Sequence, residues 1–492
     1  MNLHRSLPSN SWLATLLLTL TSALAASAAA AAEGQPNIVF ILADDLGPTD
    51  LGCYGSGYYE TPNIDRLAAD GMKFTDGYTC GPNCQPTRAA LMSGQYGPRT
   101  GVYTVGHTSR FDSSKRPLVP VPNAESLSPK VTTVAEALQA KGYATGMFGK
   151  WHLGGDRDGT SPAAQGFDEA IESSGKHFNF ATKPKVDVPK GKYLADFITD
   201  NAVGFIERHK SEPFFLYVPH FGVHSPHQAK EELIAKFRDK QAVGGHNNPT
   251  YAAMIASVDE SVGRIVGKLD ELKLSENTLV IFSSDNGGVG GYVREGIKKG
   301  GDVTDNAPFR GGKGMLYEGG TRCAYIFRRP GAIAAGSVSH EPICSVDLYP
   351  TLLELTGAAA PQHQPLDGVS YLQVLQQGGK LTRDGIYWHF PGYLGAGDDT
   401  WRTTPAGAIR SGDYKLLEFF EDDRVELYNL RDDVGQKNNL AKSEPEKTAE
   451  LLGKLRAWRR EIKAPMPEKR TDQAPTESKP KNKKGKKNRV AK

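Results

Sequence analysis

The chain has 492 residues, which is too long for one ordinary hydrophobic core and indicates a large domain joined to a smaller one. Apolar residues make up 38% and charged residues 23%, values typical of a globular protein rather than a disordered one. The net charge is +3, but residues 469–492 hold ten basic and two acidic side chains. The remaining 49 basic and 54 acidic residues leave the body negative, which argues against nucleic-acid binding.

Residues 1–32 are typical of an export signal peptide. A weakly basic start at His4 and Arg5 precedes the apolar stretch WLATLLLTLTSALAA and a run of alanines that ends at Ala32. The apolar stretch is too short for a comfortable membrane span, and no cysteine directly follows it. We therefore expect cleavage rather than a transmembrane or lipid anchor, and a mature protein in the periplasm or outside the cell.

Five cysteines are an odd number for an exported chain, in which disulfides are permissible. If Cys84 is used in other chemistry, zero, one or two bridges remain open among the other four. The alternative is that they are free buried thiols. These four residues are Cys53, Cys80, Cys323 and Cys344.

The first strand expected in the mature chain lies in PNIVFILADDLG, residues 36–47, an apolar run that ends in two carboxylates and a glycine. NTLVIFSSDNGG, residues 277–288, repeats this pattern. Between them, helical segments such as 132–143 alternate with strand candidates at 144–150 and 213–221. The alternation predicts an α/β fold with a large, mostly parallel sheet covered by helices on both faces. Ligands of such sheets bind at the carboxyl ends of the strands.

The pattern changes after about residue 378, so we place a catalytic domain at 33–377 and a smaller α+β subdomain at 378–468. Residues 408–430 predict an antiparallel hairpin that turns at 421–423. A final helix is predicted to start at Ser443, with Glu446 completing a capping box and four apolar residues at helical spacing after it. The Lys-rich residues 469–492 lack apolar periodicity and predict a disordered tail, either merely solvated or loosely attracted to a polyanionic surface.

Acidic and amide side chains follow the two strand candidates that end at 43 and 284. Asp44, Asp45, Asp285 and Asn286 offer only hard oxygen ligands, which suit Ca²⁺ or Mg²⁺ rather than zinc. Paired acids in loops are commonly just solvated. Two such pairs at the ends of two buried strands favour a metal site.

Cys84 occupies a position suited to an anion. Pro86 is well placed in the first turn of a helix, PTRAALMSG, so Cys84 is expected just before that helix. There the free N–H groups and the helix dipole favour negative charge.

The motif C-x-P-x-R followed by AALMSG resembles the signature of the type I sulfatases, in the alkaline phosphatase superfamily. NIVFILADDLG, TGMFGKWHLG, HSPH, FSSDNG and RGGKGMLYEGGTR also occur, in the family's order, and the resemblance covers residues 36–440. The resemblance implies an alkaline-phosphatase-like fold and hydrolysis of sulfate esters. It also implies that Cys84 is a precursor, oxidised to formylglycine (3-oxoalanine) by a formylglycine-generating or anaerobic sulfatase-maturating enzyme. Thr87 stands where the family usually has serine, and threonine keeps the hydroxyl.

The resemblance also assigns roles to residues that match by position. It implies one Ca²⁺, with Mg²⁺ as the weaker alternative, held by Asp44, Asp45, residue 84, Asp285 and Asn286. The residues expected to grip the sulfate and assist its transfer are Arg88, Lys150, His152, His224 and Lys313. His220 and His227 are the alternatives to His224 if the register of PHFGVHSPHQ is read differently.

The family's chemistry explains these residue types. A hydrated aldehyde has two hydroxyls on one carbon, of which one, activated by Ca²⁺ and a base, attacks sulfur. His224 and Lys313 are candidates for protonating the departing oxygen. The second hydroxyl then loses a proton to His152, which expels sulfate and restores the aldehyde. Arg88, Lys150 and Lys313 would stabilise charge on the sulfate oxygens.

A sulfated saccharide is the substrate class that the resemblance favours. Loops at 386–393, 287–308 and 104–130 are expected to line the sugar pocket, with His389, Arg294 and Lys298 as candidate contacts. For Arg294 and Lys298, solvated loop charge is the simpler interpretation.

Two other functions compete with sulfate hydrolysis. A formylglycine-dependent phosphodiester or phosphonate monoester hydrolase would share the site. Two-zinc phosphatases need a histidine where this chain has Asn286, so that residue argues against them. An inactive relative that binds sulfated glycans is the second competitor, and the intact set of residues argues against it.

Overall fold

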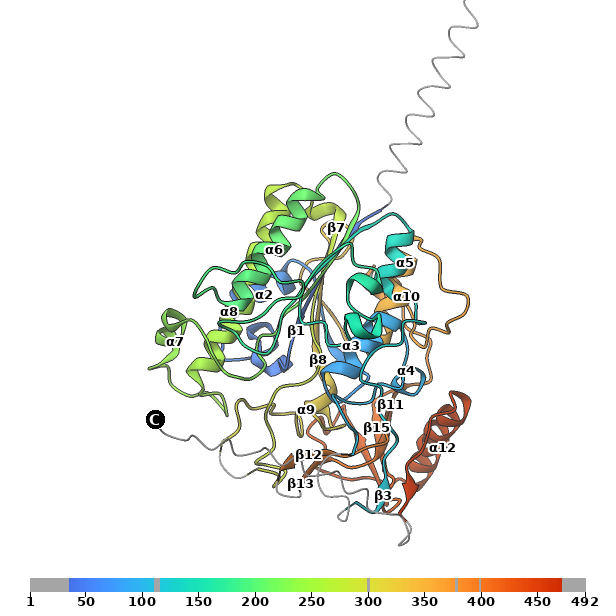
Figure 1. Ribbon diagram of the computed structural model, residues 1–492. Coiled ribbons are helices and arrows are strands. Elements are labelled where there is room, and N and C mark those ends of the chain that lie inside the picture. The colour runs from blue at the N-terminus through green and yellow to red at the C-terminus, as the bar shows by residue number, and fades with distance from the viewer. Residues whose placement is uncertain (1–34, 110–115, 299–300, 377–378, 398–399, 471–492) are drawn as a thin grey trace, which may run out of the picture.

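The computed structural model describes residues 35–109, 116–298, 301–376, 379–397 and 400–470 (Figure 1). The predicted signal peptide and most of the Lys-rich tail lie outside these ranges. No helix in the described part of the chain is long and apolar enough to cross a membrane.

A nine-stranded sheet forms the centre of the molecule, in the order β10-β2-β8-β7-β1-β6-β4-β5, with β9 beside β2. Only β8 runs antiparallel to its neighbours. The predicted large, mostly parallel sheet is confirmed. Its strands are β1 (Asn37–Ala43), β2 (Met72–Tyr78), β4 (Ala144–Gly149), β5 (Glu169–Glu172), β6 (Phe214–Pro219), β7 (Thr278–Ser284), β8 (Arg322–Arg328), β9 (Ser337–Ser339) and β10 (Ile343–Cys344).

Helices cover both faces of this sheet, as Figure 1 shows. Side chains of the central strands alternate between two apolar clusters, one on each face. One face is covered by α2 (Pro62–Ala69), α6 (Leu194–Arg208) and α8 (Pro249–Glu271), with α7 (Glu231–Phe237) packed on α8. The other carries α3 (Cys84–Ser93), α5 (Val134–Ala140) and α10 (Leu348–Thr356), together with the short α4 (Gly97–Thr100) and α11 (Leu372–Leu375).

Strand register brings three loops to one edge of the sheet. Leu42 of β1 pairs with Pro219 of β6 and with Ser283 of β7, all in parallel. The residues that follow these strands therefore emerge side by side.

A separate four-stranded antiparallel sheet, in the order β11-β14-β15-β16, forms the C-terminal part. The predicted turn at 421–423 joins β15 to β16, and a second turn at Gly412–Asp413 adds β14 to this ribbon. The remaining elements are β11 (Ile386–Phe390), β14 (Ala406–Ser411), β15 (Tyr414–Phe419), β16 (Val425–Asn429), the hairpin β12 (Leu394–Gly397) with β13 (Thr400–Thr403), and the pair β3 (Leu118–Val119) with β17 (Glu468–Lys469).

The predicted start of the last helix is wrong. α12 runs from Pro445 to Glu461, and Glu444 is its N-cap residue. Ser443 therefore lies outside the helix, where its hydroxyl donates to the Leu440 carbonyl, and the N-cap residue Glu444 makes no side-chain capping bond. Pro445 sets the start because proline fits the first helical position, which needs no N–H donor. Leu451, Leu455 and Trp458 are buried, as their spacing predicts.

A buried network of charges joins the two sheets. The Glu318 carboxylate, in the short helix α9 (Glu318–Thr321), lies 2.8 Å from Lys415 Nζ on β15 and 2.7 Å from Arg322 Nε on β8. The Tyr78 hydroxyl donates to the same carboxylate at 2.8 Å. Removing one member of such a buried set is strongly destabilising, because it leaves a charge without its partner.

Candidate active site

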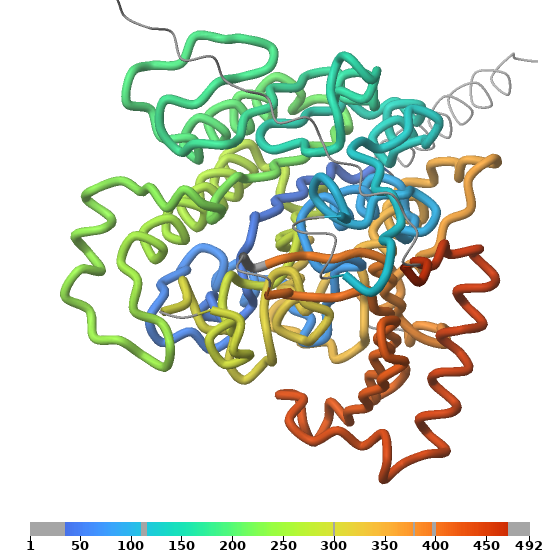
Figure 2. Tube along the Cα trace, turned by 60° about the horizontal axis from the view of Figure 1, so that its bottom comes forward, coloured from blue at the N-terminus to red at the C-terminus, as the bar shows by residue number. Residues whose placement is uncertain are grey.

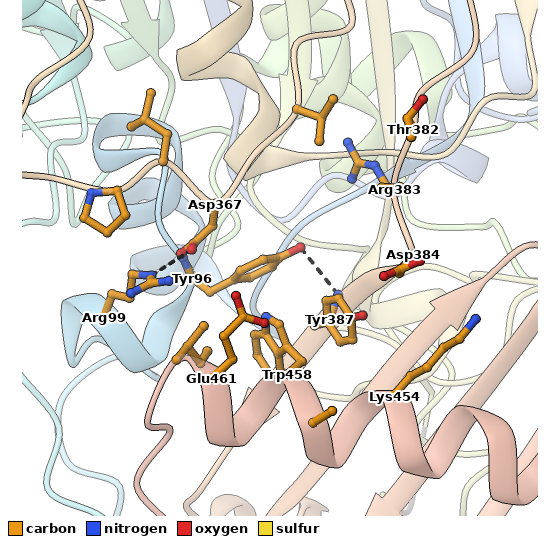
Figure 3. Close-up of a pocket in the computed structure, with 16 residues that line it drawn as sticks. Tyr96, Arg99, Asp367, Thr382, Arg383, Asp384, Tyr387, Lys454, Trp458 and Glu461 are labelled. Atoms are coloured by element: carbon orange, nitrogen blue, oxygen red, sulfur yellow. Dashed lines mark hydrogen bonds and ion pairs between the residues drawn. The ribbon is translucent and has the colours of Figure 1, made fainter.

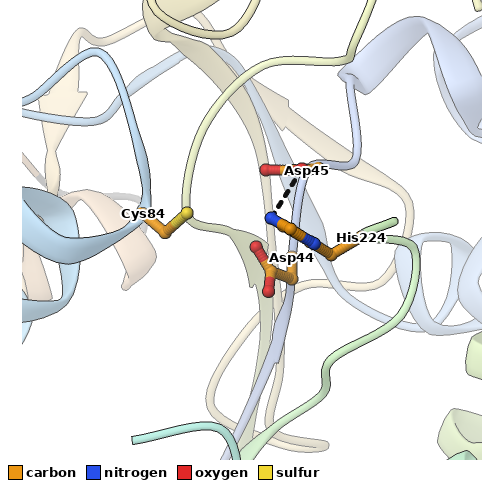
Figure 4. Close-up of side chains that lie close together, drawn as sticks. All are labelled: Asp44, Asp45, Cys84 and His224. Atoms are coloured by element: carbon orange, nitrogen blue, oxygen red, sulfur yellow. Dashed lines mark ion pairs between the residues drawn. The ribbon is translucent and has the colours of Figure 1, made fainter. Parts of the chain in front are cut away.

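The candidate site lies at the shared edge where β1, β6 and β7 end. Ligand atoms of Asp44, Asp45, Cys84 and His224 all lie within 4.8 Å of one another (Figure 4). They come from the end of β1, from α3 and from the loop after β6. The parallel register therefore assembles residues that are 180 positions apart along the chain.

Cys84 is the first residue of α3, not the residue before the helix as predicted. The helix starts two residues earlier than expected because Pro86 occupies a first-turn position, where no intrahelical N–H bond is required. The Cys84 side chain is 1% exposed, and burial raises the pKa of its thiol to about 12. An unmodified Cys84 is therefore a protonated thiol and a poor nucleophile.

Three cations form ion pairs with three carboxylates around Cys84. Lys150 Nζ lies 2.5 Å from Asp44 Oδ2. Lys313 Nζ lies 2.7 Å from Asp45, and Arg88 binds Asp285 through Nε at 2.8 Å. The three cations were predicted to contact sulfate, and the three acids to hold a metal. In the structure the opposite charges of these six groups neutralise one another.

Two buried oxygens lack any partner and fit a cation. Asp44 Oδ1 and Asn286 Oδ1 make no hydrogen bond to any described residue, although both side chains are fully buried. The Asn286 amide nitrogen donates to Asp45 Oδ1 at 2.9 Å, which turns its own oxygen away from that carboxylate. Unpaired buried acceptors are costly, and a hard cation that accepts oxygen ligands satisfies them.

The crowded carboxylates shift one another's ionisation. Burial and the neighbouring Asp44 charge raise the pKa of Asp285 to about 7, against the opposing effect of Arg88. For Asp44, burial is outweighed by Lys150 and the other nearby cations, and its pKa lies well below its ordinary value. His224, rather than Asp285, completes the compact four-residue cluster, while Asp285 Oδ1 accepts from the Asp45 backbone N–H at 3.2 Å.

His152 is held in a left-handed backbone conformation, with φ of 65°, in the loop after β4. Its Nδ1 is buried and has no hydrogen-bond partner among the residues that the structure describes. Burial, reinforced by Lys150 and Arg88, lowers the pKa of the ring to about 2. The ring is thus neutral and offers a free nitrogen.

Of the three histidines considered after β6, His224 lies nearest the site. Its Nε2 is 3.7 Å from Asp45 Oδ2, and 27% of its side chain is exposed. His220 is fully buried and contacts Ser261 Oγ of α8 at 3.0 Å. His227 packs its ring against Tyr251.

His177 was not among the predicted site residues. Its Nε2 lies 2.8 Å from the His224 carbonyl oxygen, and its ring packs against Phe221, 4.9 Å between centroids. Burial lowers the pKa of His177 to about 4, so the neutral ring donates this bond and fixes the loop that carries His224. No motif marked it, because a lone histidine in a loop shows no spacing that reveals such a contact.

Lys313 lies on a loop that two glycine-rich segments hold in place. A side chain on Gly312 would collide with the Gly290 carbonyl, and Gly314 has φ of 91°. Only glycine allows these backbones to pack so closely. The Lys313 N–H donates to the Gly288 carbonyl at 3.0 Å, which ties this loop to the one after β7.

The three predicted sugar contacts are dispersed. His389 is 7% exposed on β11, with Nε2 2.8 Å from the Pro465 carbonyl, so its position does not support a sugar contact. Arg294 pairs with Asp305 at 2.5 Å, and the exposed Lys298 donates to the Gly301 carbonyl. Both side chains lie in a loop, where they are exposed to solvent or pair with a nearby group.

All five cysteines are free thiols in the structure, which agrees with the alternative of free thiols rather than disulfide bridges.

A cavity of about 460 Å³ lies elsewhere, between α12 and the segments around Tyr96 and Asp367, and none of the predicted catalytic residues lines it (Figure 3). The stacked rings of Tyr387 and Trp458 form part of its wall.

Comparison with known proteins agrees with this geometry. The family described as Sulfatase matches residues 36–358, and the family described as N-sulphoglucosamine sulphohydrolase, C-terminal, matches residues 311–462. A sulfatase of Formosa agariphila is 35% identical, over 87% of this chain and 89% of its own length. N-acetylgalactosamine-6-sulfatase of Sus scrofa is 36% identical, over 76% of this chain and 72% of its own length.

Solved structures show the same fold. The crystal structure of Ps i-CgsB in complex with k-i-k-neocarrahexaose is 30% identical, with a TM-score of 0.72 over 86% of this chain and 92% of that one. Phosphonate monoester hydrolase of Agrobacterium radiobacter, at 20% identity and a TM-score of 0.64, shares the fold alone. The chain therefore belongs to the sulfatase family, and it is a sulfuric ester hydrolase.

Proposed function

We propose that this protein hydrolyses sulfate esters of saccharides, using a formylglycine made from Cys84 and one Ca²⁺. The observation that carries the proposal is the set of three paired cations and carboxylates around a buried Cys84. The relatives support a sugar substrate. They include N-acetylgalactosamine-6-sulfatases, and the structure of Ps i-CgsB was determined with a neocarrahexaose.

The carboxylates would hold the metal. Asp44, Asp45, Asp285 and Asn286 provide the oxygen ligands, with the side chain of residue 84 beside them, and Mg²⁺ is the weaker alternative. When bound, calcium supplies positive charge that stabilises an ionised oxygen nucleophile and the sulfate oxygens. The formylglycine hydrate supplies two hydroxyls on one carbon, one to attack sulfur and one to release sulfate.

Pairing of the carboxylates with calcium would free the three cations for the substrate. Arg88 and Lys150 then bind the equatorial sulfate oxygens, and a planar guanidinium can do so through two N–H groups. Lys313 reaches the oxygen that joins sulfur to the sugar. The same three cations would thus pair with the carboxylates and grip the sulfate.

Two histidines would move protons. His224, partly exposed and 3.7 Å from Asp45, donates a proton to the departing oxygen together with Lys313. His152 accepts a proton from the residue 84 side chain at its free ring nitrogen. Bound sulfate offsets the positive charges of Lys150 and Arg88 and so raises the pKa of His152 from its low value.

A desulfation screen tests this function. The protein is coproduced with a formylglycine-generating or anaerobic maturating enzyme, and sulfate release is measured from defined sulfated saccharides and from matched phosphate monoesters, phosphodiesters and phosphonates. We expect turnover of sulfated saccharides with the highest kcat/KM. Preference for a phosphodiester or phosphonate would assign the protein to the competing hydrolase class.

A further inference from the structure

The hairpin β12–β13 carries a side chain of the C-terminal part to the loop of Lys313. A Cβ on Gly314 would lie 2.7 Å from Leu394 Cδ2 and 3.0 Å from Arg402 Cδ. Figure 2 shows this orange hairpin crossing the middle of the view, beside yellow segments of the chain. Arg402 therefore lies directly beside the backbone that positions the catalytic lysine.

The Arg402 guanidinium lies above a ring that is bonded to the same loop. Its central carbon is 4.6 Å from the centroid of Tyr292. The Tyr292 hydroxyl donates to the Lys313 carbonyl at 2.8 Å. A guanidinium stacked on an aromatic ring keeps the N–H groups along its edge free, and these can bind an anion that lies in the plane of the guanidinium.

Within the described part of the chain, Arg402 has no acidic partner, unlike the three cations at the centre of the site. No carboxylate of the described residues lies at ion-pair distance from it, and its Nε is buried without a hydrogen bond. The neighbouring Arg294, by contrast, pairs with Asp305. A partly buried cation with an unpaired N–H is unfavourable in the free protein, and an anionic ligand removes that cost.

We propose that Arg402 binds a second anionic group of the substrate, carried by the saccharide near the sulfate that is cleaved. This inference rests on the proposed sulfatase function and narrows its substrate class to saccharides with two anionic groups. The second group is an oxyanion, a uronate carboxylate or another sulfate, and either binds two N–H groups of one guanidinium. Arg402 is thus a specificity-determining residue.

Binding to an inactive protein tests this assignment without turnover. In the Cys84→Ala background, calorimetry compares three matched disaccharides: one with a single sulfate on neutral sugars, one with an added uronate, and one with an added second sulfate. Arg402→Gln should weaken binding of either or both doubly anionic ligands by about 10–100-fold, and that of the singly sulfated ligand far less. The two doubly anionic ligands distinguish carboxylate from sulfate as the natural partner.

Two further variants make the result specific. Arg402→Lys keeps the positive charge but cannot donate two parallel N–H bonds to one oxyanion. Its affinity for the doubly anionic ligands should therefore lie between those of the Arg402→Gln variant and the protein with Arg402. Arg431→Gln is the control, because Arg431 is 73% exposed and pairs with Asp413 on the C-terminal sheet. It should change the affinity for none of the three ligands.

Turnover by the enzyme that carries formylglycine at residue 84 provides a second measurement. Arg402→Gln should lower the ratio of kcat/KM between doubly and singly anionic substrates by a similar factor. Equal losses for all three ligands, or no loss for any, would overturn the role of Arg402. If the wild-type enzyme released no sulfate from any substrate, the proposed function would fail, while the binding comparison would still decide the role of Arg402.

Discussion

Replacing Lys313 by methionine separates two roles that this lysine has in our proposal. The substitution keeps the alkyl chain but removes the ammonium, which lies 2.7 Å from Asp45 and is 13% exposed. In the metal-free protein it leaves Asp45 without its cation, and breaking such a buried pair costs about 3–5 kcal/mol. In the transition state it removes a cation aimed at developing negative charge. A lost contact of that kind lowers kcat by about 10²–10³-fold.

The two effects respond differently to calcium. Calcium that binds Asp45 takes the place of the lost ammonium, so saturating calcium should restore much of the melting temperature of Lys313→Met. It should not restore kcat on a small aryl sulfate, because the cation at the leaving oxygen is still missing. Lys298→Met, on the exposed part of the loop after β7, is the control and should leave both quantities unchanged. A Lys313→Met enzyme with normal kcat would refute this reasoning.

Three other predictions follow from the same structure. Elemental analysis should find one calcium per chain, lost in Asp285→Ala, whereas two zinc ions per chain would indicate a phosphatase-type centre. Burial opposes ionisation of Glu318, but Lys415 and Arg322 prevail and lower its pKa below the ordinary 4.5. Its contribution to stability is therefore complete above pH 4.5 and is lost as the pH falls through the lower folded pKa. The melting temperature should fall in acid, and it should fall less steeply with pH in Lys415→Met. Equal dependence of the melting temperature on pH in the two proteins would contradict this. Truncation after Arg470 should leave kcat on an aryl sulfate unchanged and raise KM only for a polymeric substrate, by an amount that fades with added salt; a truncated protein unable to turn over the aryl sulfate would contradict it.

The sequence predicted the parts of the fold that local patterns encode. The buried strands β1 and β7 were identifiable because their apolar, β-branched runs end in acidic residues and glycines. The acidic motifs meet because parallel strands share one edge, which is a rule of topology rather than of sequence. The start of α12 was misplaced because Ser443 and Glu446 have the spacing of a capping box, while Pro445 between them decides the helical start.

Residues that act through distant contacts carried no such signal. His177 contacts the backbone of His224 across 47 positions, and Arg402 meets Tyr292 from a hairpin that the sequence did not predict. His389 was a candidate sugar contact because it lies in the loop predicted to line the sugar pocket, and its burial against the Pro465 carbonyl does not support that role. Such pairings depend on how the small sheet packs on the large one. Local composition does not encode that packing.

The most direct test concerns the chemical state of residue 84. Peptide mass spectrometry and sulfate release are measured together for the wild-type protein, Cys84→Ala and Cys84→Ser, each coproduced with a maturating enzyme. We predict formylglycine at residue 84 in the active wild type, no turnover by the alanine variant, and at most a trapped sulfated enzyme from the serine variant. Steady turnover by Cys84→Ala, or full activity of a wild-type protein that retains the thiol, would contradict the mechanism.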